Sequence, residues 1–444
     1  MDTRSQFSRI WSATSMTNLA DGLFLMAVPL IAVTVTSSPA LIAGLRVAQT
    51  LPWFLFGLFV GVLVDRVDRR RLMLAAETLR GVALLGIAVT AAVTGLNLPL
   101  LYVAALLVGV AETVSETAAH ALVPMVVEPE RLPRANGRLF GTQMVMNDFV
   151  GAPVGALLVA AGTVVAVFAP AGLYLAAAGV LLTVRGRYAV VRTTRTSVLA
   201  DVREGIGTLV RNRTIARLTV YAVVTNLVNT AFFAVFVVFA VGSGSALGLS
   251  GFGYSVLIIV AAVGAVSGAA AAGRLAERVP PRHLLTGAVL ALAICFVTPF
   301  AVPNAVAVGA ALLLSGFATA VSAVVNTSLR QSLVPSRLLG RVSAGFRFLA
   351  FGARPVGALA GGIVAQALTP GRLFAVLAVV VLSLVPLTIR LRPESAAQAG
   401  RPTPGEPAGP VESALPVEPA APVARAGSAG PTLPPSGTGG DHER

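Results

Sequence analysis

Long hydrophobic stretches separated by short polar connectors follow one another along the chain as far as residue 391. A transmembrane helix needs about 20 mostly apolar residues, because each residue rises about 1.5 Å through roughly 30 Å of hydrocarbon. Twelve stretches meet this requirement, so we predict an all-α integral membrane protein with twelve transmembrane helices. The predicted spans are residues 10–35, 40–64, 72–94, 98–122, 138–161, 163–184, 216–241, 250–273, 284–303, 304–328, 342–367 and 372–391.

The connectors between the predicted spans alternate in charge. Arginines gather in every second connector, whereas the connectors between them carry no basic residue before Arg372. Membrane proteins retain Lys and Arg on the cytoplasmic side, so this alternation predicts that both termini are cytoplasmic. The arginine-rich connectors contain Arg66, Arg69, Arg70 and Arg71; Arg131 and Arg134; the segment 185–213; Arg274, Arg278 and Arg282; and Arg330, Arg337 and Arg341.

Composition agrees with a membrane location and removes other classes of protein. Hydrophobic residues make up 56% of the chain and charged residues 12%, and the mean hydropathy is +0.83, more apolar surface than a soluble core could bury. The net charge of +14 does not indicate nucleic-acid binding, because the arginines lie in the connectors. All 33 basic residues are arginine, a bias typical of GC-rich bacterial genomes, so we expect a bacterial plasma membrane protein.

The sequence contains no pattern of a catalytic, metal or nucleotide site. The single cysteine, Cys295, excludes a disulfide framework, and His120, His283 and His442 are too dispersed for a metal site. No phosphate-binding loop of the ATPase type is present, so ATP is not the expected energy source. We therefore expect no enzymatic activity, no cofactor and no metal. The expected partners are a small-molecule substrate, protons and the lipid bilayer, and we expect a monomer.

Short sequence matches indicate that the chain contains two related halves. The segment "GVLVDRVDRR" from Gly61 returns as "GRLAERVPPR" from Gly273, and "TNLADGLF" in the first span returns as "TNLVNTAF" in the seventh. Two further matches, "LVP" and "PVGAL", occur in the same order, and the four offsets range from 202 to 212 residues. We predict two six-helix bundles in parallel orientation, residues 1–184 and 216–392.

Two segments outside the bundles differ from the spans. Residues 185–215 form a longer connector, for which we expect a cytoplasmic amphipathic helix lying along the membrane surface. Residues 393–444 include eleven prolines mixed with Ala, Gly, Glu and Ser, a composition typical of a disordered cytoplasmic tail. The apolar stripe of the expected amphipathic helix consists of Val198, Val202, Ile206 and Leu209.

The connector between the second and third spans carries a distinctive pattern. Gly61 is followed four residues later by Asp65 and then by the basic residues Arg66, Arg69 and Arg70. A carboxylate at this place can cap a neighbouring helix, and the arginines can pair with acids of the other bundle. Such contacts hold one state of an alternating-access cycle and break in the other. We therefore predict a gating loop here, although a pure signal for membrane topology is the alternative.

Over residues 1–392 the chain resembles transporters of the major facilitator superfamily, because this loop pattern is the one found there between helices two and three. Asp68 departs from the pattern, since many members carry glycine at that position. With "LPWFLFGLFVGVLVDR", "GVAETVSETAAHALVP" and "RLPRANGRLFGTQ", the chain is similar to the branch containing macrolide-efflux and enterobactin-export proteins. The resemblance implies two bundles around a central cavity. The second half repeats the loop at Gly273, Glu277 and Arg278, which we include in the gating loop.

Few ionisable residues lie within the predicted spans, and each is a candidate functional group because a charge in hydrocarbon is costly. Asp21 lies near mid-depth in the first span, and Asp148 lies in the fifth. Glu112 and Glu116 are one helical turn apart, so they share a face of the fourth span. Desolvation favours the neutral form of such carboxyl groups and lets them exchange protons near neutral pH. These four acids are candidates for proton coupling, and a structural ion pair is the alternative for each.

Three further polar residues of the spans are candidates for a role beside the acids. Arg354 in the eleventh span is expected to pair with one of the acids, and contact with substrate is its alternative role. Asn229 in the seventh span occupies the position equivalent to Asp21, so the two halves differ in charge there. Arg46, near the outer end of the second span, is expected to extend its guanidinium toward the membrane surface.

Acids in the first half and a cation in the second favour export of a small, largely apolar compound (a drug, a macrolide-like antibiotic or a siderophore) by proton antiport. Nutrient uptake or facilitated permeation is an alternative. It predicts more polar groups in the seventh and tenth spans than Asn226, Asn229 and Asn326. A non-transporting membrane sensor or a lipid-translocating protein is a further alternative, and it predicts no substrate-dependent proton flux.

Overall fold

Residues 3–128, 131–186, 188, 198–242, 244–334 and 339–391 are described by the structure, a computed structural model. Within this part of the chain, short connectors join helices, and one isolated β-bridge links Val241 and Leu249. Twelve helices are long and apolar enough to cross a membrane. The predicted all-α fold with twelve spans is therefore confirmed, whereas the expected tail, residues 393–444, lies outside the described residues.

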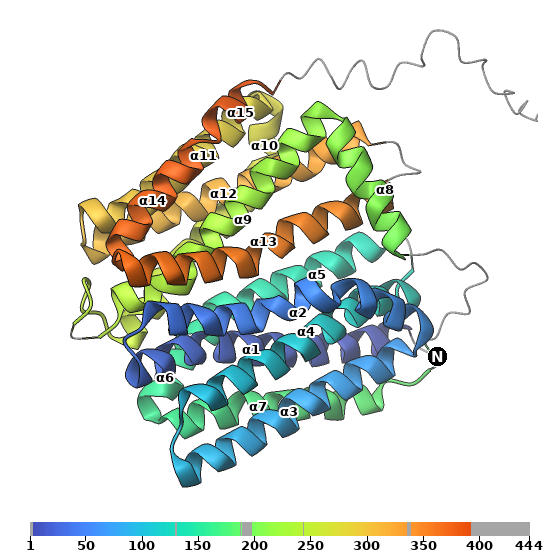
Figure 1. Cartoon of the computed structure of the whole chain (residues 1–444). Helices are drawn as coiled ribbons and strands as arrows, with labels where there is room; N and C mark the ends of the chain where they lie inside the picture. The colour runs from blue at the N-terminus through green and yellow to red at the C-terminus, as the bar shows by residue number, and fades with distance from the viewer. Residues whose placement is uncertain are drawn as a thin grey trace, which may run out of the picture. The chain divides into compact units, whose positions relative to one another are not determined.

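Helices of the first half pack mainly on one another (Figure 1). Helix α3 packs between α4 and α7, α1 lies against α7, and α2 lies against α4. These helices are α1 (Thr3–Val35), α2 (Pro39–Arg66), α3 (Arg69–Thr94), α4 (Leu98–Val126), α5 (Leu132–Met144), the π-helix η2 (Val145–Gly151), α6 (Ala152–Ala161) and α7 (Thr163–Thr183).

The second half repeats this arrangement around an aromatic core. Helix α10 packs on α12, α9 on α13, and α11 on both α12 and α14. The Phe232 ring lies 4.9 Å from the Phe236 ring and 4.7 Å from the Phe374 ring, measured between centroids. The helices are α8 (Val198–Arg211), α9 (Arg213–Ala240), α10 (Gly251–Arg278), α11 (Pro281–Ala301), α12 (Ala305–Leu333), α13 (Leu339–Ala367), α14 (Pro370–Leu382) and α15 (Val385–Ile389).

Polar side chains set the start of several helices. Asn97, Asn212 and Asn304 accept hydrogen bonds of 2.8 to 3.3 Å from backbone N–H groups in the first turns of α4, α9 and α12. Ser38 and Ser250 accept such bonds for α2 and α10, at 3.4 and 3.1 Å. These caps satisfy donors that have no partner inside the helix and contribute about 1 kcal/mol each. The short connectors therefore determine where these helices begin.

The fifth span contains a π-helical turn that the sequence pattern did not indicate. Helices α5, η2 and α6 follow one another directly, and η2 covers Val145–Gly151. Glycine lets α1 approach this turn closely, because a Cβ on Gly22 would collide with the carbonyl of Asn147. A Cβ on Gly151 would collide with the carbonyl of Met146 and with Gly22 itself. Such turns occur frequently at functional sites, and this one lies between α1 and α10.

Helix α8 lies where the amphipathic helix was predicted, but it packs on other helices. It contacts α13 and α9, and Leu209 is 1% exposed. Ile206 is half-buried, whereas the side chains of Val198 and Val202 lie outside the described residues. The described part of the apolar stripe therefore packs on protein at Leu209, and the expected position along the membrane surface stays a prediction.

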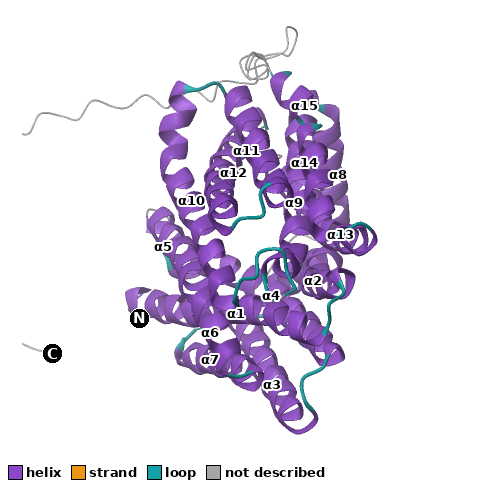
Figure 2. Cartoon of the chain, turned by 90° about the vertical axis from the view of Figure 1, so that its left-hand side faces the viewer, coloured by secondary structure: helices purple, strands orange, loops and turns teal. Residues whose placement is uncertain are grey.

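The two halves meet along α2 and α13 and along α6 and α10 (Figure 2). The described connectors without arginine lie at one end of the helices, which we call the arginine-poor end: residues 36–38, 95–97, 162, 241–242, 244–250, 302–304 and 368–369. Near this end Ser38 Oγ donates to Gln366 Oε1 at 2.8 Å. A Cβ on Gly362 would lie 2.7 Å from the Cβ of Ala43. The helices of the two halves therefore touch closely near the arginine-poor end.

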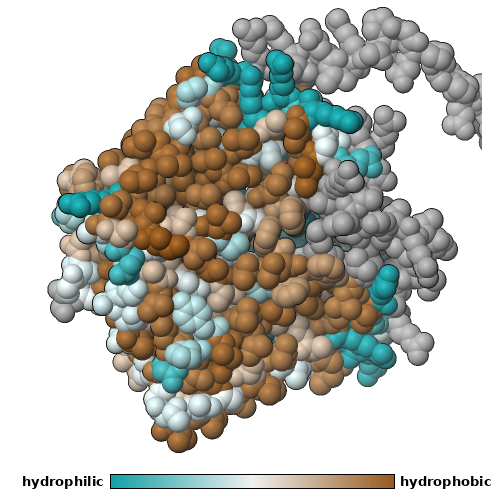
Figure 3. Space-filling model, viewed as in Figure 1, coloured by the Kyte–Doolittle hydropathy of each residue, from teal (hydrophilic) through white to brown (hydrophobic). Residues whose placement is uncertain are grey.

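Large hydrophobic side chains cover the outside of the helices. Figure 3 shows them over most of the face that it presents. Phe59 is 72% exposed, Val93 82% and Val306 80%. Monomeric soluble proteins rarely expose contiguous apolar surface of this extent, whereas lipid contact removes its cost. The chain is an integral multi-pass membrane protein.

Candidate functional site

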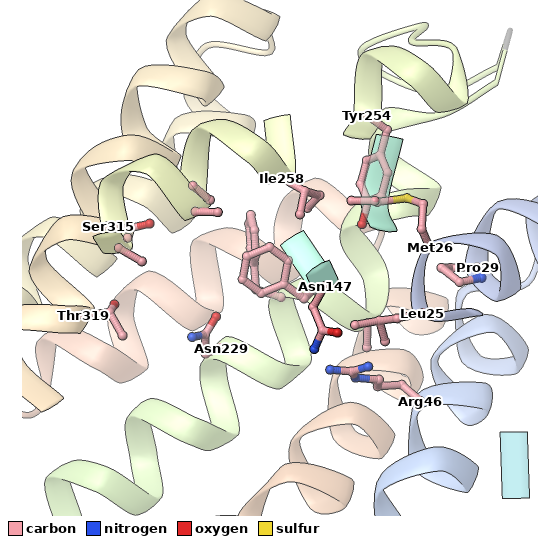
Figure 4. Close-up of a pocket in the computed structure, with 18 of the residues that line it drawn as sticks. Leu25, Met26, Pro29, Arg46, Asn147, Asn229, Tyr254, Ile258, Ser315 and Thr319 are labelled. Carbon is pink, nitrogen blue, oxygen red and sulfur yellow. The ribbon is translucent and has the colours of Figure 1, made fainter. Parts of the chain in front are cut away.

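A cavity of about 440 Å³ lies between the two halves of the structure (Figure 4). Most of its lining is apolar and comes from α1, α2, α9, α10, α11 and α12. The rings of Phe232, Phe233 and Tyr254 and the side chains of Met26 and Ile258 are part of this apolar lining. Concave apolar sites of this size bind small molecules through burial of apolar area, with a few polar groups fixing the orientation. We call this space the apolar cavity.

Three polar side chains are prominent in the apolar cavity. Figure 4 shows Arg46 and Asn147 pointing into the same region, and Asn229 also lines the space. Arg46 Nη1 donates to Gln49 Oε1 at 3.0 Å. The expectation that Arg46 extends toward the membrane surface is wrong, because its position on α2 faces the other half across the cavity.

A second cavity, of about 370 Å³, carries many of the candidate charges. Glu112 and Glu116 line it from α4, and Arg347 and Arg354 line it from α13. Asn147, on the π-helical turn, lines both cavities, so the two spaces adjoin. We call the second space the charged cavity. The apolar cavity and the charged cavity, which has acids on one wall and arginines on the other, therefore meet at Asn147.

The described charges of this charged cavity are held apart. Arg354 Nε donates to Asn226 Oδ1 at 3.0 Å, in place of the acidic partner that the sequence predicted. Glu116 Oε1 lies 3.6 Å from His120 Nε2, and Glu116 is 37% exposed. Among the described residues, no cationic group lies at ion-pair distance from Glu112. Glu112 therefore lines the charged cavity without a described ion-pair partner.

A buried cluster lies beside these cavities within the first half. Arg80 Nη1 is 3.3 Å from Asp21 Oδ1 and 3.6 Å from Glu77 Oε2. Tyr174 donates to Asp21 Oδ1 at 2.6 Å, and Ser115 donates to Glu77 Oε1 at 2.5 Å. The side chains of Arg80 and Glu77 are each 1% exposed, and that of Asp21 is 20% exposed. The Arg80 guanidinium therefore pairs with two carboxyl groups, Asp21 on α1 and Glu77 on α3.

Sequence reasoning found Asp21 and missed Glu77 and Arg80. Both missed residues follow the arginine-rich connector at Arg69 within three turns, so they look like an extension of that polar segment. Their spacing of three residues, which puts an acid and a base on one helix face inside a predicted span, was the signal that could have found them. The structure pairs Asp21 with Arg80, whereas the sequence had indicated Arg354 as the partner of one of the acids without saying which.

The arginines of the predicted gating loop contact the first half itself. Arg70 donates from Nε and Nη2 to the carbonyl oxygens of Leu181 and Leu182, both at 2.9 Å. Arg69 Nη1 donates to the carbonyl oxygen of Tyr188 at 3.2 Å. These bonds tie the start of α3 to the end of α7. The expected pairing of the arginines with acids of the other half stays a prediction.

Asp68, the residue that departs from the family pattern, caps α3. Its Oδ1 accepts from the backbone N–H of Arg71 at 3.1 Å, and its Oδ2 accepts from the backbone N–H of Tyr188 at 2.8 Å. A capping role was expected of Asp65, but the side chains of Asp65 and Asp148 lie outside the described residues. Their predicted roles in gating and proton coupling stay predictions.

The other gating-loop positions lie at the ends of α2 and α10. Arg66, Glu277 and Arg278 are exposed. A Cβ on Gly61 or Gly273 would meet no atom within 4 Å. Close packing in this structure therefore does not explain the two glycines, and the role of the repeated loop stays a prediction.

Twelve membrane helices in two related halves, with a cavity between them, define a membrane transporter. Residues 10–354 match the Major Facilitator Superfamily, and the chain belongs to this family of transporters. The function class is therefore transport across a membrane and not enzymatic catalysis.

Two named relatives are exporters. Enterobactin exporter EntS of Salmonella typhi is 25% identical over 350 residues, which cover 77% of this chain and 81% of that protein. Macrolide efflux protein A of Streptococcus pyogenes is 26% identical over 155 residues, or 34% of this chain. That second match spans only 38% of the relative's own length.

Solved structures show the same fold. A bacterial homologue of the iron transporter ferroportin in the inward-facing state has a TM-score of 0.69 and 16% sequence identity, and the match covers 90% of this chain and all of that one (100%). The nucleoside transporter NupG has a TM-score of 0.66 and 13% identity, covering 88% of this chain and 100% of the other. At these identities the likeness concerns the fold alone.

Proposed function

We propose that this protein exports a small, largely apolar compound by proton antiport with alternating access. A drug, a macrolide-like antibiotic or a siderophore fits this description. The compound occupies the apolar cavity, and protons enter through carboxyl groups beside it. The protein acts as a monomer in a bacterial plasma membrane, with the small molecule, protons and lipid as its partners.

The observation that carries the proposal is the contact between the two cavities at Asn147. The apolar cavity supplies area for hydrophobic binding, while Glu112 and Glu116 supply groups that can gain or lose a proton next to it. Because Glu112 lacks a described cationic partner, a change in its charge alters the field in the adjoining chamber directly.

The direction of transport is supported by the relatives. Both named proteins, an enterobactin exporter and a macrolide efflux protein, move compounds outward by their names. The enterobactin exporter aligns over most of both chains, so the likeness covers both halves of the transporter. Outward transport driven by inward proton flow needs side chains that bind and release protons. Asp21, Glu112, Glu116 and Asp148 are our candidates for these coupling acids. Asn229 and Arg354 are the proposed substrate contacts.

Transport by purified full-length protein in liposomes tests the proposal. A pH gradient is imposed, and a panel of apolar compounds is screened for accumulation together with proton movement, reported by a trapped pH dye. We expect accumulation of at least one compound that collapses when the gradient is removed. Movement of a compound without protons would replace antiport with facilitated permeation. Absence of any substrate-dependent proton flux across the panel would favour a sensor or a lipid-translocating protein.

The arginine-rich end of the helices is proposed to face the cytoplasm. Reporters of membrane topology fused after Val67, within residues 185–195 and at the C-terminus should all report the cytoplasm. A reporter at Ser245, on the connector between α9 and α10, should report the exterior. A robust inversion at any of these sites would overturn the proposed orientation.

A further inference from the structure

The buried cluster of Asp21, Glu77 and Arg80 contains one more acid than base. With both carboxyl groups ionised, its net charge is −1, and the Arg80 and Glu77 side chains are only 1% exposed. An uncompensated charge is costly inside a membrane protein, and a single proton makes this cluster neutral.

The surroundings of the cluster supply no second described cation. Tyr174 faces it from α7, and Ser115 faces it from α4. The charges that reach Asp21 from α4 belong to Glu112 and Glu116, which are acids. These acids increase the negative charge around the cluster, so they also favour the uptake of a proton.

The hydrogen bonds distinguish the two carboxyl groups. Asp21 Oδ1 accepts from both Tyr174 and Arg80, and Asp21 is the partly exposed member. Glu77 Oε1 accepts from Ser115, and the Thr17 hydroxyl on α1 also reaches the Glu77 carboxyl group. Glu77 Oε2 is buried, and no donor meets the geometry of a full hydrogen bond to it. Arg80 Nη1 lies 3.6 Å from Oε2, beyond hydrogen-bond length. An ionised oxygen without a donor is costly to bury, and a proton on it removes the charge.

We propose that Glu77 holds one proton, on Oε2, and shares it with Asp21. In the structure Asp21 is ionised and paired with Arg80. When the proton passes from Glu77 to Asp21, the O–H bond on Glu77 breaks, an O–H bond forms on Asp21, and the Arg80 guanidinium moves toward the ionised Glu77. The number of protons in the cluster is one before and after this exchange. Glu77 and Arg80 thus form a proton site on α3 that lines neither cavity.

The role of this site in coupling rests on the proposed function, but the protonation of Glu77 does not. The cluster joins α1 to α3 and α7, whereas the apolar cavity is lined by α1 but not by α3 or α7. A change in the Asp21–Arg80 contact therefore moves α1 relative to the outer helices of the first half. Substrate and proton then act on the same helix.

Infrared difference spectroscopy on the purified full-length protein tests the proposal. A protonated carboxyl group has a C=O stretching band that an ionised one lacks. We expect such a band at neutral pH in the wild type and its loss in Glu77→Gln. Asp21→Asn should also lose it, because Glu77 then ionises to balance Arg80. The matched control is Glu128→Gln, an exposed acid that pairs with Arg131 at 3.3 Å and should leave the band unchanged.

Two hydroxyl variants assign the proton without removing either acid. Ser115→Ala deletes the hydrogen bond to Glu77 Oε1 and should shift the band to higher frequency, because a hydrogen bond to a carbonyl oxygen lowers its stretch. Tyr174→Phe deletes the bond to Asp21 and should leave the band in place. A band that survives Glu77→Gln, or that shifts only with Tyr174→Phe, would overturn the assignment. If Glu77→Gln does not fold, the two hydroxyl variants decide by themselves.

A transport measurement separates this inference from the proposed function. Glu77→Gln should lose pH-driven accumulation while retaining exchange of the compound across the membrane without a gradient. If the wild type moves no protons with any compound, the proposed function fails, yet the infrared assignment of Glu77 can still hold. If the wild type is proton-coupled and Glu77→Gln keeps full pH-driven accumulation, Glu77 is no part of the coupling and the proposal fails.

Discussion

Arg80 joins three helices through its side chain alone. Its guanidinium contacts Asp21 on α1 and Glu77 on its own helix, and it lies 5.0 Å from the centroid of the Tyr174 ring on α7. Because the side chain is almost completely buried, water cannot replace these contacts when one is removed. The cluster contains two acids and one base. Removing the base should therefore cost more stability than removing one of the acids.

We expect Arg80→Gln to destabilise the protein far more than Asp21→Asn. The first change leaves two buried acids without a cation, and breaking a buried pair costs about 3–5 kcal/mol. The second change leaves the Glu77–Arg80 pair, so its cost should be smaller. Thermal unfolding in detergent and membrane abundance measure both. Arg66→Gln, at an exposed position, is the control and should behave as the wild type. Equal losses for Arg80→Gln and Asp21→Asn would contradict the shared-cation arrangement.

Substitution of Glu112 should affect transport and leave stability almost unchanged, in contrast to substitution of Arg80. Since it has no described ion-pair partner, Glu112→Gln should change the stability by less than about 0.5 kcal/mol, as for substitutions that remove no close contact. The neutral amide mimics the protonated carboxyl, so substrate exchange should survive while pH-driven accumulation is lost. Liposome flux with and without a gradient measures this difference. Unaltered pH-driven accumulation would remove Glu112 from the coupling acids.

At the scale of elements, the contact between α1 and the π-helical turn depends on glycine. A Cβ on Gly22 would lie 2.6 Å from the Asn147 carbonyl oxygen, and that oxygen belongs to the backbone. Backbone cannot move aside as a flexible side chain can, so the two elements would have to separate. Because Asn147 lines both cavities, such a separation would change the site as well as the packing.

We therefore expect Gly22→Ala to cost about 1–3 kcal/mol, the usual range for overpacking. The matched control is Gly57→Ala on α2, where a Cβ would meet no atom within 4 Å. That control should be neutral or should stabilise its helix by up to about 1 kcal/mol. Thermal unfolding of both variants in the same detergent gives the comparison. A Gly22→Ala variant as stable as Gly57→Ala would show that α1 does not press on the turn.

At the scale of the whole molecule, the close contact of α2 and α13 near the arginine-poor end must open in an alternating-access cycle. A Cβ on Gly362 would lie 2.7 Å from the Cβ of Ala43, so a small shift brings two cysteines at these positions to disulfide distance. The chain has one other cysteine, the buried Cys295, which Cys295→Ser removes from the experiment.

In that background, we expect the Ala43→Cys, Gly362→Cys double variant to stop transport when oxidised and to recover on reduction. The disulfide would join the halves at one end, while binding of compound to the cavity could persist. Flux in liposomes before and after a reductant measures the effect, and each single cysteine variant is its control. Full transport by the oxidised double variant, with the disulfide confirmed by mass, would show that this end does not open.

The predictability of the site varies from residue to residue. Asp21 was found because an acid inside a hydrophobic span stands out, and Glu112 was found for the same reason. Glu77 was not recognised as a site residue, because only a few residues separate it from the arginine-rich connector. Its burial is therefore not visible in the local sequence pattern. The partner of Arg354 was predicted wrongly in kind: an acid was expected, and the structure supplies the Asn226 amide. Sequence spacing locates charges along one helix, but it carries no information on which helix lies opposite.

The sequence by itself determined the twelve spans, their alternating direction and the relation of the two halves. Each of these follows from hydrocarbon thickness, arginine placement or repetition, all of which are properties of short segments. Only the tertiary structure decided that Arg46 faces a cavity, that Arg80 serves both Asp21 and Glu77, and that a π-helical turn places Asn147 between two chambers. The physical reason is that hydrophobicity places a helix in the membrane, whereas its rotation and neighbours follow from side-chain packing between segments far apart in the chain.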